Sequence, residues 1–326
     1  MQLVKQHKNM LMIGFLFIIV VVAYLFLWMF THTYDSISTD VFVRILSRRS
    51  IHLIAMMVSA ILVVLSSLIF QTMTHNRILT PSILGFDSIF IATQTMIVFV
   101  LGNTSSLISN PFINFALSSI TMAVISVSLY QSMLKKFNNN LALMLLFGIV
   151  IATLLRSMVS FIQTIMNPDE FQSVAAATTV TITSINTQLV IYVLPIMLVI
   201  IASYVYLKKQ YDVMALGRNH AVGLGLNYDK LQRISLILVS LSLAISTALV
   251  GPLSFLGLMA VNASKEFTHS FKHGLLMIVS SMIGIIFLIG GQLLVEQTGF
   301  ITSVTVFISL FGGLYILFLI LKENTL

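Results

Sequence analysis

Residues that could carry out chemistry are scarce in this sequence. Its 326 residues include ten Asp and Glu, 17 Lys and Arg, seven His and no Cys. Without cysteine there is no disulfide, no thiolate metal ligand and no cysteine nucleophile. The phosphate-binding pattern G-x-x-x-x-G-K-[ST] is absent, as are the catalytic patterns H-E-x-x-H and G-x-S-x-G. We therefore expect no enzymatic activity, no resident cofactor or metal, and no ATP binding by this chain alone.

One charged residue, Arg156, lies well inside a long apolar stretch that begins at Leu141. At 1.5 Å per residue, Arg156 lies about 22 Å along a helix that starts there. One interpretation is a side chain that extends towards the membrane surface or pairs with a nearby carbonyl. The other is a residue that attracts an anionic cargo along a pathway. Only the second predicts loss of transport without loss of assembly.

The elements that position these residues are set by composition. Apolar residues make up 58% of the chain, charged residues 8%, and the mean hydropathy is +1.04, whereas soluble domains are about a quarter charged. Apolar runs of about 20 residues fit helices across a membrane and not the short alternating strands of a barrel. The sequence therefore predicts an all-α polytopic membrane protein. Its ten transmembrane helices are expected at about 10–30, 50–72, 82–101, 112–133, 141–165, 188–207, 233–251, 255–266, 274–296 and 302–321.

Two of these predicted spans need comment. The first follows a basic lead like that of a signal peptide, but it has no small-residue cleavage site, so we expect a retained span. The eighth is short because Gly251-Pro252 interrupts an apolar stretch, and proline removes a helix hydrogen bond.

Basic residues between the spans indicate which side each connection faces. With a cytoplasmic N-terminus, the inner segments hold 13 of the 17 basic residues, namely Lys5, Lys8, Arg77, Lys135, Lys136, Lys208, Lys209, Arg218, Lys230, Arg233, Lys265, Lys272 and Lys322. Outside lie only Arg44, Arg48 and Arg49. The positive-inside rule therefore favours both termini in the cytoplasm. The net charge of +7 reflects topology, and no nucleic acid is expected as a partner.

The acidic residues are predicted to avoid the middle of the bilayer. Asp87 is expected near an inner boundary, Glu296 near an outer one, and the other eight in connections or chain ends. An ion-driven secondary transporter usually needs a carboxylate near the midplane to bind its coupling ion. The pattern disfavours such a transporter, and we expect the energy to come from another subunit.

Two predicted connections are longer than turns. Residues 166–187 lie outside, and residues 208–232 lie inside with three glycines and enough apolar residues for one or two short helices. The inner segment is where we expect a cytosolic partner to bind.

A weak internal similarity links Pro81–Phe86 with Pro252–Gly257. Five spans separate the two, so a repeat would be inverted in the membrane, and chance similarity is the alternative. We predict one transmembrane domain over residues 1–326, with inverted-repeat-like halves at about 49–165 and 217–321.

Several segments together resemble the FecCD-type permeases of ABC importers, which take up iron–siderophore complexes, haem and vitamin B12. The family's first signature, R-x-P-R with a later Gln and R-N-P-L-A-x-P-x-x-L-G, appears at Arg49–His52, Gln71 and His75–Gly85. Its first proline, its second arginine and the Asn-Pro proline are lost. The third signature, G-P-I-x-F-x-G-L-x-x-P-H, matches Gly251–Leu258, with Val261-Asn262 in place of Pro-His.

The second signature of the family, L-G-x-x-x-A-x-x-L-G, lies in the predicted inner segment. The resemblance implies that it forms coupling helices resting in a groove of an ATPase, with the residues Leu216, Gly217, Arg218, Ala221, Leu224 and Gly225. Arg218 and Asn219 stand where the family usually has acids, which implies a partner groove of different charge. A loop with helix-ending glycines is the alternative, but it does not explain the ten-residue pattern.

The resemblance also implies outer and intramembrane contacts. Carboxylates of a binding protein would meet Arg49 and, at the second basic position, His52, whose partial charge at neutral pH would make docking pH-sensitive. Glu296 stands where the family often has a third arginine, which puts that contact in doubt. Positioning at the lipid headgroups is the alternative for Arg49. Gln71, Arg156 and Asn262 are the expected residues of the translocation pathway.

The function that the resemblance implies is transport without catalysis. The chain would be a permease subunit of an ATP-driven importer of ferric siderophores in a bacterial cell membrane, similar to the catechol or anguibactin-like branch. The implied partners are an ABC ATPase dimer, an extracytoplasmic siderophore-binding protein, a second permease subunit that is identical or a paralogue, and membrane lipid. The alternatives are a haem or vitamin B12 permease, an ion-coupled secondary transporter, and a membrane scaffold or receptor.

Overall fold

The computed structural model describes residues 2–27, 39–102, 105, 110–137, 141–180, 185–299 and 302–323, and none of these lies in a strand. In chain order the helices are α1 (Gln2–Phe26), α3 (Thr39–Thr74), the 3₁₀ helix η1 (Pro81–Leu84), α4 (Phe86–Leu101), α6 (Pro111–Lys136), α7 (Leu141–Ile165), α8 (Pro168–Thr178), α9 (Thr187–Met214), α10 (Arg218–Gly223), α11 (Tyr228–Val250), α12 (Leu256–Thr268), α13 (His273–Gln297) and α14 (Val304–Glu323). The predicted all-α fold is confirmed.

Local signals in the sequence explain where several helices begin and end. Asn110, Asn186 and Asn227 accept backbone N–H bonds at the starts of α6, α9 and α11, which satisfies donors that a first helical turn leaves unpaired. After α11 the chain breaks at Gly251, whose φ is 102°, and at Pro252, which has no N–H. These breaks make α12 a separate short helix.

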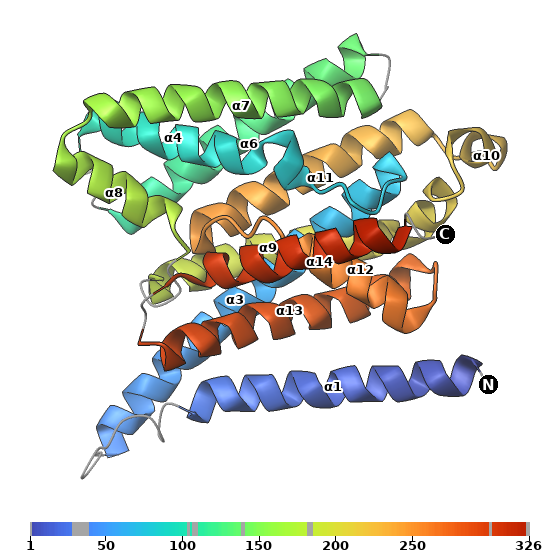
Figure 1. Ribbon diagram of the computed structural model, residues 1–326, viewed down its shortest axis with the longest axis horizontal. Helices are drawn as coiled ribbons and strands as arrows, with labels where there is room; N and C mark the ends of the chain where they lie inside the picture. Colours follow the sequence, from blue (N-terminus) through green and yellow to red (C-terminus); the bar gives the residue numbers. More distant parts are fainter. Residues whose placement is uncertain are drawn as a thin grey trace.

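The centre of the molecule is α3. In its most apolar stretch 83% of the residues are buried, because α9, α11, α12 and α13 pack around it. Figure 1 shows α4, α6, α7 and α8 along one edge of the molecule and α1 along the opposite edge. The core therefore lies around α3, and α1 and α7 present most of their surface outwards.

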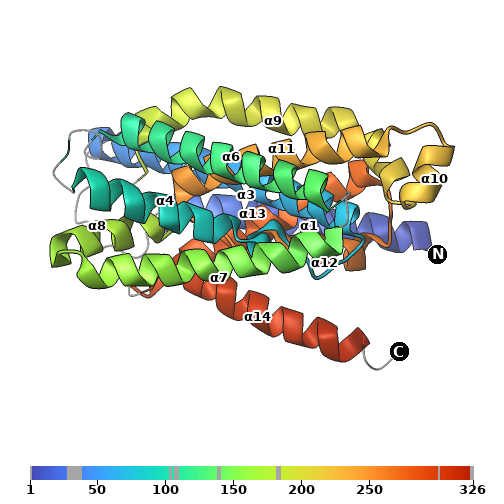
Figure 2. The same cartoon turned by 90° about the horizontal axis from the view of Figure 1, so that it is seen from above.

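The two ends of the bundle differ in what they carry. The start of α1, the end of α14 and the short helix α10 lie at one end, which we call the inner end (Figures 1 and 2). The start of α3 and α8 lie at the opposite, outer end. The arrangement agrees with a chain whose two termini share one side of the membrane with the 208–232 segment.

Seven of the described helices are long and apolar enough to cross a membrane: α1, α3, α6, α7, α9, α11 and α13. The apolar stretches of α4 and α14 are shorter, and α12 has 13 residues. Each of the ten predicted spans coincides with a helix, but the prediction that all ten cross the membrane stays a prediction.

Two boundaries differ from the sequence-based expectation. α3 begins at Thr39, well before residue 50, so Arg44, Arg48 and Arg49 lie on a helix and not in a loop. The predicted outer connection 166–187 contains the helix α8, which Asn167-Pro168 starts. Residues 28–30 of the predicted first span and residues 181–184 of that connection lie outside the described residues.

Candidate functional site

A cavity of about 1110 Å³ opens among the outer ends of α3, α6, α8, α9 and α11. Its wall contains the exposed side chains of Arg44 and Arg48. Among the described lining residues there is no Asp or Glu. Deeper in the wall, Gln94 Nε2 donates to Ser118 Oγ at 2.6 Å, which fixes an amide of α4 against α6. The charged side chains among the described lining residues of the outer cavity are therefore the two arginines.

The three residues expected to dock a binding protein, Arg49, His52 and Glu296, are turned inward beside this cavity. Arg49 Nη2 donates to Glu296 Oε2 at 2.7 Å, and Nε and Nη2 both donate to the Tyr24 carbonyl. The guanidinium also lies 4.4 Å from the Tyr24 ring centroid, within cation–π range. The His52 side chain is buried. In this arrangement Arg49 and Glu296 hold α1, α3 and α13 together, and docking of a binding protein at these residues stays a prediction.

A carboxylate lies deep between the two similar loops of the chain. Ser254 Oγ donates to Asp87 Oδ2 at 2.5 Å. At 1.5 Å per residue this contact lies about 20 Å from the outer end of α4 and about 20 Å from the inner end of α12. Asp87 is the second residue of α4, next to η1. Its expected place near the inner boundary stays a prediction.

Arg156 on α7 lies close to this carboxylate. Its Nε donates to Ser88 Oγ at 3.0 Å, and its charge acts on Asp87. The Ser88 partner is a hydroxyl and not the carbonyl of the first interpretation, so both interpretations of Arg156 stay predictions. The side chain is nevertheless exposed on the surface of this chain. An exposed guanidinium at this depth is costly against lipid, which favours water or another protein surface beside it.

The exposed face of α7 around Arg156 is polar over several turns. Exposed hydroxyl side chains recur at helical spacing, at Thr153, Ser157, Ser160 and Thr164. The hydroxyls of Thr153, Ser157 and Thr164 donate to carbonyls one turn earlier in the same helix. They are therefore tolerated in an apolar setting, and it is Arg156 that distinguishes this face. We call it the α7 polar face.

A second cavity, of about 620 Å³, lies at the inner end among α3, α12 and α13. Two of the expected pathway residues, Gln71 and Asn262, line it. Lys265 Nζ donates to Gln71 Oε1 at 2.7 Å, and Asn262 Nδ2 donates to the Arg77 carbonyl at 2.9 Å. These bonds tie α12 to the end of α3. The structure therefore brings Gln71 and Asn262 together at the inner end and places Arg156 apart from them, on α7.

The predicted coupling pattern forms a short helix bounded by two glycines. α10 spans Arg218–Gly223, and Gly217 and Gly225 on either side have φ of 91° and 83°. A Cβ placed at either glycine would meet nothing within 4 Å. Glycine is required here by the direction of the chain and not by lack of space. α10 is thereby held at the inner end of the molecule.

Side chains of the coupling pattern differ in exposure. Leu216 and Leu224 are 55% and 66% exposed, whereas Ala221 is buried. Arg218 Nη2 makes an exposed ion pair with Asp229 Oδ2 at 3.1 Å. Two exposed leucines beside a short helix form an apolar patch suited to a partner.

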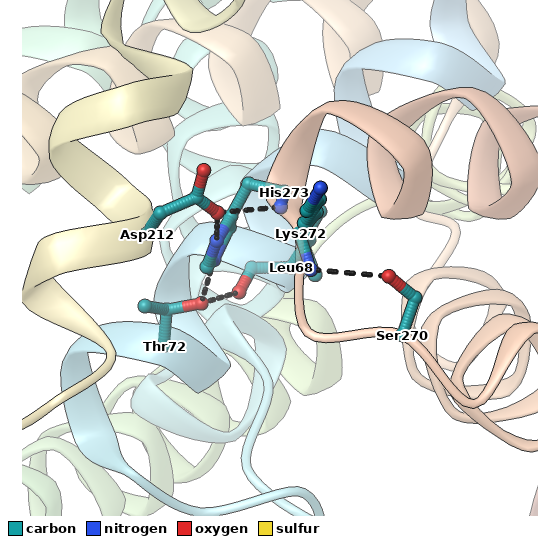
Figure 3. Close-up of polar contacts among 6 residues, drawn as sticks. All are labelled: Leu68, Thr72, Asp212, Ser270, Lys272 and His273. Carbon is teal, nitrogen blue, oxygen red and sulfur yellow. Dashed lines mark hydrogen bonds and ion pairs between the residues drawn. The ribbon is translucent and has the colours of Figure 1, made fainter.

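A hydrogen-bonded cluster joins the end of α9 to α13 and α3, as Figure 3 shows. Asp212 Oδ1 accepts the backbone N–H of His273 at 2.7 Å and lies 2.9 Å from its Nδ1. The other ring nitrogen, Nε2, lies 2.8 Å from Thr72 Oγ1, and the Thr72 hydroxyl donates to the Leu68 carbonyl at 2.9 Å. We call Asp212, His273 and Thr72 the inner clasp. It fastens α9 two residues before that helix ends at Met214.

Sequence reasoning did not find three of these contacts. The partners in Arg49–Glu296, Ser254–Asp87 and Asp212–His273 are 247, 167 and 61 positions apart. Only the second pair had a signal, because Asp87 follows one of the two similar Pro-containing segments and Ser254 lies in the other.

Comparison with known proteins identifies the family. Residues 10–322 match the model of the FecCD transport family. The petrobactin import system permease protein YclO of Bacillus subtilis is 43% identical over 86% of this chain and 89% of its own length. The petrobactin import system permease protein FatC of Bacillus anthracis is 31% identical over 89% of this chain and 82% of its own.

A solved structure shares the fold. It is described as a metal-chelate type ABC transporter in an inward-facing conformation, and it matches with a TM-score of 0.81 at 18% identity over 97% of this chain and 99% of that one. The match to the family model covers nearly the whole chain. The chain therefore belongs to the FecCD transport family, as a membrane permease subunit and not as a catalytic one.

Proposed function

We propose that this chain is the permease subunit of an ATP-driven importer of ferric siderophores in a bacterial cell membrane. The observation that carries the substrate class is the 43% identity, over 86% of the chain, with a permease of a petrobactin import system. The proposed partners are an ABC ATPase dimer, an extracytoplasmic siderophore-binding protein and a second permease subunit, which we take to be a paralogue.

The translocation pathway is proposed to run along the α7 polar face. Arg156 supports this placement, because it is exposed on a single chain at a depth where lipid would be a poor neighbour. A second permease facing α7 would enclose that surface around water and cargo. Gln71 and Asn262 are proposed to line the inner part of the route, beside the inner cavity.

Coupling to the ATPase is proposed to pass through α10 and its flanking residues. The exposed Leu216 and Leu224 would rest on the partner, with Gly217 and Gly225 fixing the direction of α10. The inner clasp supports this proposal, because Asp212 ties the end of α9 to α13 and α3. A displacement of α10 would then move three helices and not one loop.

Docking of the binding protein is proposed to use Arg44 and Arg48 in place of Arg49 and His52. Both arginines are exposed on the first turns of α3, at the outer end. The guanidinium group of Arg49, in contrast, is mostly buried against Glu296 and the Tyr24 carbonyl. Docking would then lack the pH sensitivity expected from His52.

The topology is proposed to be ten transmembrane helices with both termini in the cytoplasm. Residues 1–326 would form one permease domain with inverted-repeat halves at about 49–165 and 217–321. The Ser254–Asp87 contact supports this proposal, because it joins corresponding segments of the two halves. In each half a short helix follows a proline-containing break, η1 at Pro81 and α12 after Pro252.

Reconstitution tests the proposed function. The chain is co-expressed with its ATPase and second permease, placed in proteoliposomes, and supplied with binding protein and ferric petrobactin. We expect iron uptake that requires both ATP on the ATPase side and the binding protein, and no uptake of haem or vitamin B12. Accumulation by this chain alone without nucleotide, or purification in mild detergent without an ATPase, would contradict the proposal.

A further inference from the structure

We propose that the outer cavity is a binding site on this subunit for an anionic, oxygen-rich iron chelate. The site would hold the chelate before it enters the pathway along α7. The inference rests on the proposed function, because it takes the chelate to be the cargo.

The size and shape of the outer cavity favour a small molecule. Its volume of about 1110 Å³ lies near the upper end of small-molecule sites, which span roughly 300–1,000 Å³. Interfaces between proteins are commonly broad, with about 800 Å² buried on each partner. The cavity is a recess among the ends of five helices, and its volume suits a bulky chelate.

The charge of the cavity favours an anion. Helix ends of both signs reach it, since Pro111 and Thr187 begin α6 and α9 while Thr179 and Val250 follow or end α8 and α11. Their dipoles therefore largely offset one another. The two guanidinium groups of Arg44 and Arg48 then decide the sign, because no carboxylate lies among the described lining residues. Guanidinium groups bind carboxylate oxygens with two parallel hydrogen bonds.

The wall of the cavity is organised for oxygen-rich ligands. Asn114 and Gln188 line it from α6 and α9, where their amides can donate to a chelate. Ser118 Oγ donates to the Asn114 carbonyl at 2.6 Å and accepts from the buried Gln94. This chain of bonds holds the α4–α6 wall in place before any ligand arrives, which reduces the cost of binding.

The chain that lines the outer cavity continues directly to the polar groups around Asp87. Gly251 lines the cavity, and Ser254, three positions later, donates to Asp87. Asp87 in turn lies within electrostatic reach of Arg156 on the α7 polar face. The polar groups of Ser254 and Asp87 would then lie between a chelate in the outer cavity and Arg156 on the proposed pathway.

A binding measurement without the binding protein tests the inference. The complete importer is placed in nanodiscs, and equilibrium binding of radioiron-labelled ferric petrobactin is measured with the double variant Asn114→Leu/Gln188→Leu. Because each hydrogen bond to a charged ligand contributes to the binding free energy, we expect the double variant to bind about tenfold more weakly, or weaker still. Gln172→Leu is the matched control, because Gln172 is exposed on α8 but does not line the cavity, and it should bind as the wild type does.

Further measurements separate this site from the docking surface. Arg44→Gln/Arg48→Gln should weaken both chelate binding and binding-protein affinity, whereas Asn114→Leu/Gln188→Leu should weaken chelate binding alone. Gel filtration with the ATPase bound checks that each variant assembles.

The outcomes against the inference are specific. The inference is overturned if the assembled wild type shows no saturable binding of the chelate, or if an equal concentration of inorganic phosphate displaces the chelate. It is also overturned if Asn114→Leu/Gln188→Leu binds the chelate as tightly as the control Gln172→Leu. Should ATP-driven uptake persist in those cases, the proposed function stands without this site. Absence of any uptake would instead remove the proposed function.

Discussion

Glycine serves opposite purposes in two regions of this molecule. Where α12 crosses α3, a Cβ placed at Gly257 would lie 2.6 Å from Ser67 Cβ and 3.0 Å from the Val63 carbonyl oxygen. Beside α10, a Cβ at Gly217 or Gly225 would meet nothing within 4 Å. The first glycine permits a close helix crossing, and the other two only set the direction of the chain.

The difference separates what the fold requires from what a partner requires. Close crossings of small residues are a main source of cohesion between helices in a membrane, where lipid is as apolar as the side chains. The crossing of α3 and α12 is therefore part of the fold itself. The open space around α10 leaves its surface to another protein. Substitutions in the two regions should accordingly fail in different assays.

The largest expected effect is that of Gly257→Leu. The new side chain would overlap Ser67 and the backbone of α3, and overpacking of this kind costs about 1–3 kcal/mol or more. We expect little folded permease by gel filtration in detergent. Gly290→Leu is the control, because a Cβ at Gly290 meets nothing within 4 Å. Equal yields of the two variants would remove the distinction between the regions.

The next effect is expected in function and not in folding. Leu216→Glu places a charge on the apolar patch beside α10, where Leu216 is 55% exposed. We expect normal yield and normal assembly with the second permease, together with loss of ATP-driven uptake. Lys230→Glu is the control for added negative charge, because Lys230 is exposed near the start of α11. Val205→Glu would not serve, because Val205 lies in a span. Unchanged uptake in Leu216→Glu would count against coupling through α10.

The Arg49–Glu296 pair lies between these extremes. Arg49→Gln would leave the half-buried Glu296 carboxylate without its guanidinium partner, and we expect the free energy of unfolding to fall by about 1–3 kcal/mol. A double-mutant cycle with Glu296→Gln, followed by thermal unfolding, measures the coupling between the two. Arg44→Gln should leave this stability unchanged. A coupling energy near zero would show that the pair does not tie α3 to α13.

The smallest effect is expected for Arg218→Gln. Its ion pair with Asp229 is exposed on both sides, and such pairs contribute about 0–1 kcal/mol. Thermal unfolding should therefore be nearly unchanged, and added salt should reduce any difference from wild type, because salt screens exposed charges. A stability loss as large as that of Arg49→Gln would mean that α10 belongs to the packed part of the fold.

Much of the architecture follows from the sequence, because helical spans depend on local composition. Every predicted span coincides with a helix, and the glycines at 217, 225 and 251 mark helix boundaries where expected. Asn110 and Asn186 explain the starts of α6 and α9 through their own side chains. These features need no knowledge of distant neighbours.

The site could be predicted only in part, because its contacts join distant positions. The family pattern assigned Arg49 to docking, but a pattern does not reveal that Glu296 lies 2.7 Å away. The hydrogen bond from Ser254 to Asp87 joins positions 167 apart, so local composition does not reveal it. The outer cavity depends on the part of α3 that precedes residue 50, where the span predicted from hydropathy begins.

The inner clasp has a mechanical consequence for α9. Pro195 interrupts the hydrogen bonding of that helix, about 25 Å from Asp212 at 1.5 Å per residue. Between Pro195 and Asp212, α9 is an uninterrupted helix. Its end at Asp212 is anchored to α13 and α3, and its hydrogen bonding is weakened at Pro195. If α10 couples to an ATPase as proposed, a displacement of α10 would be transmitted along this part of α9 towards Pro195.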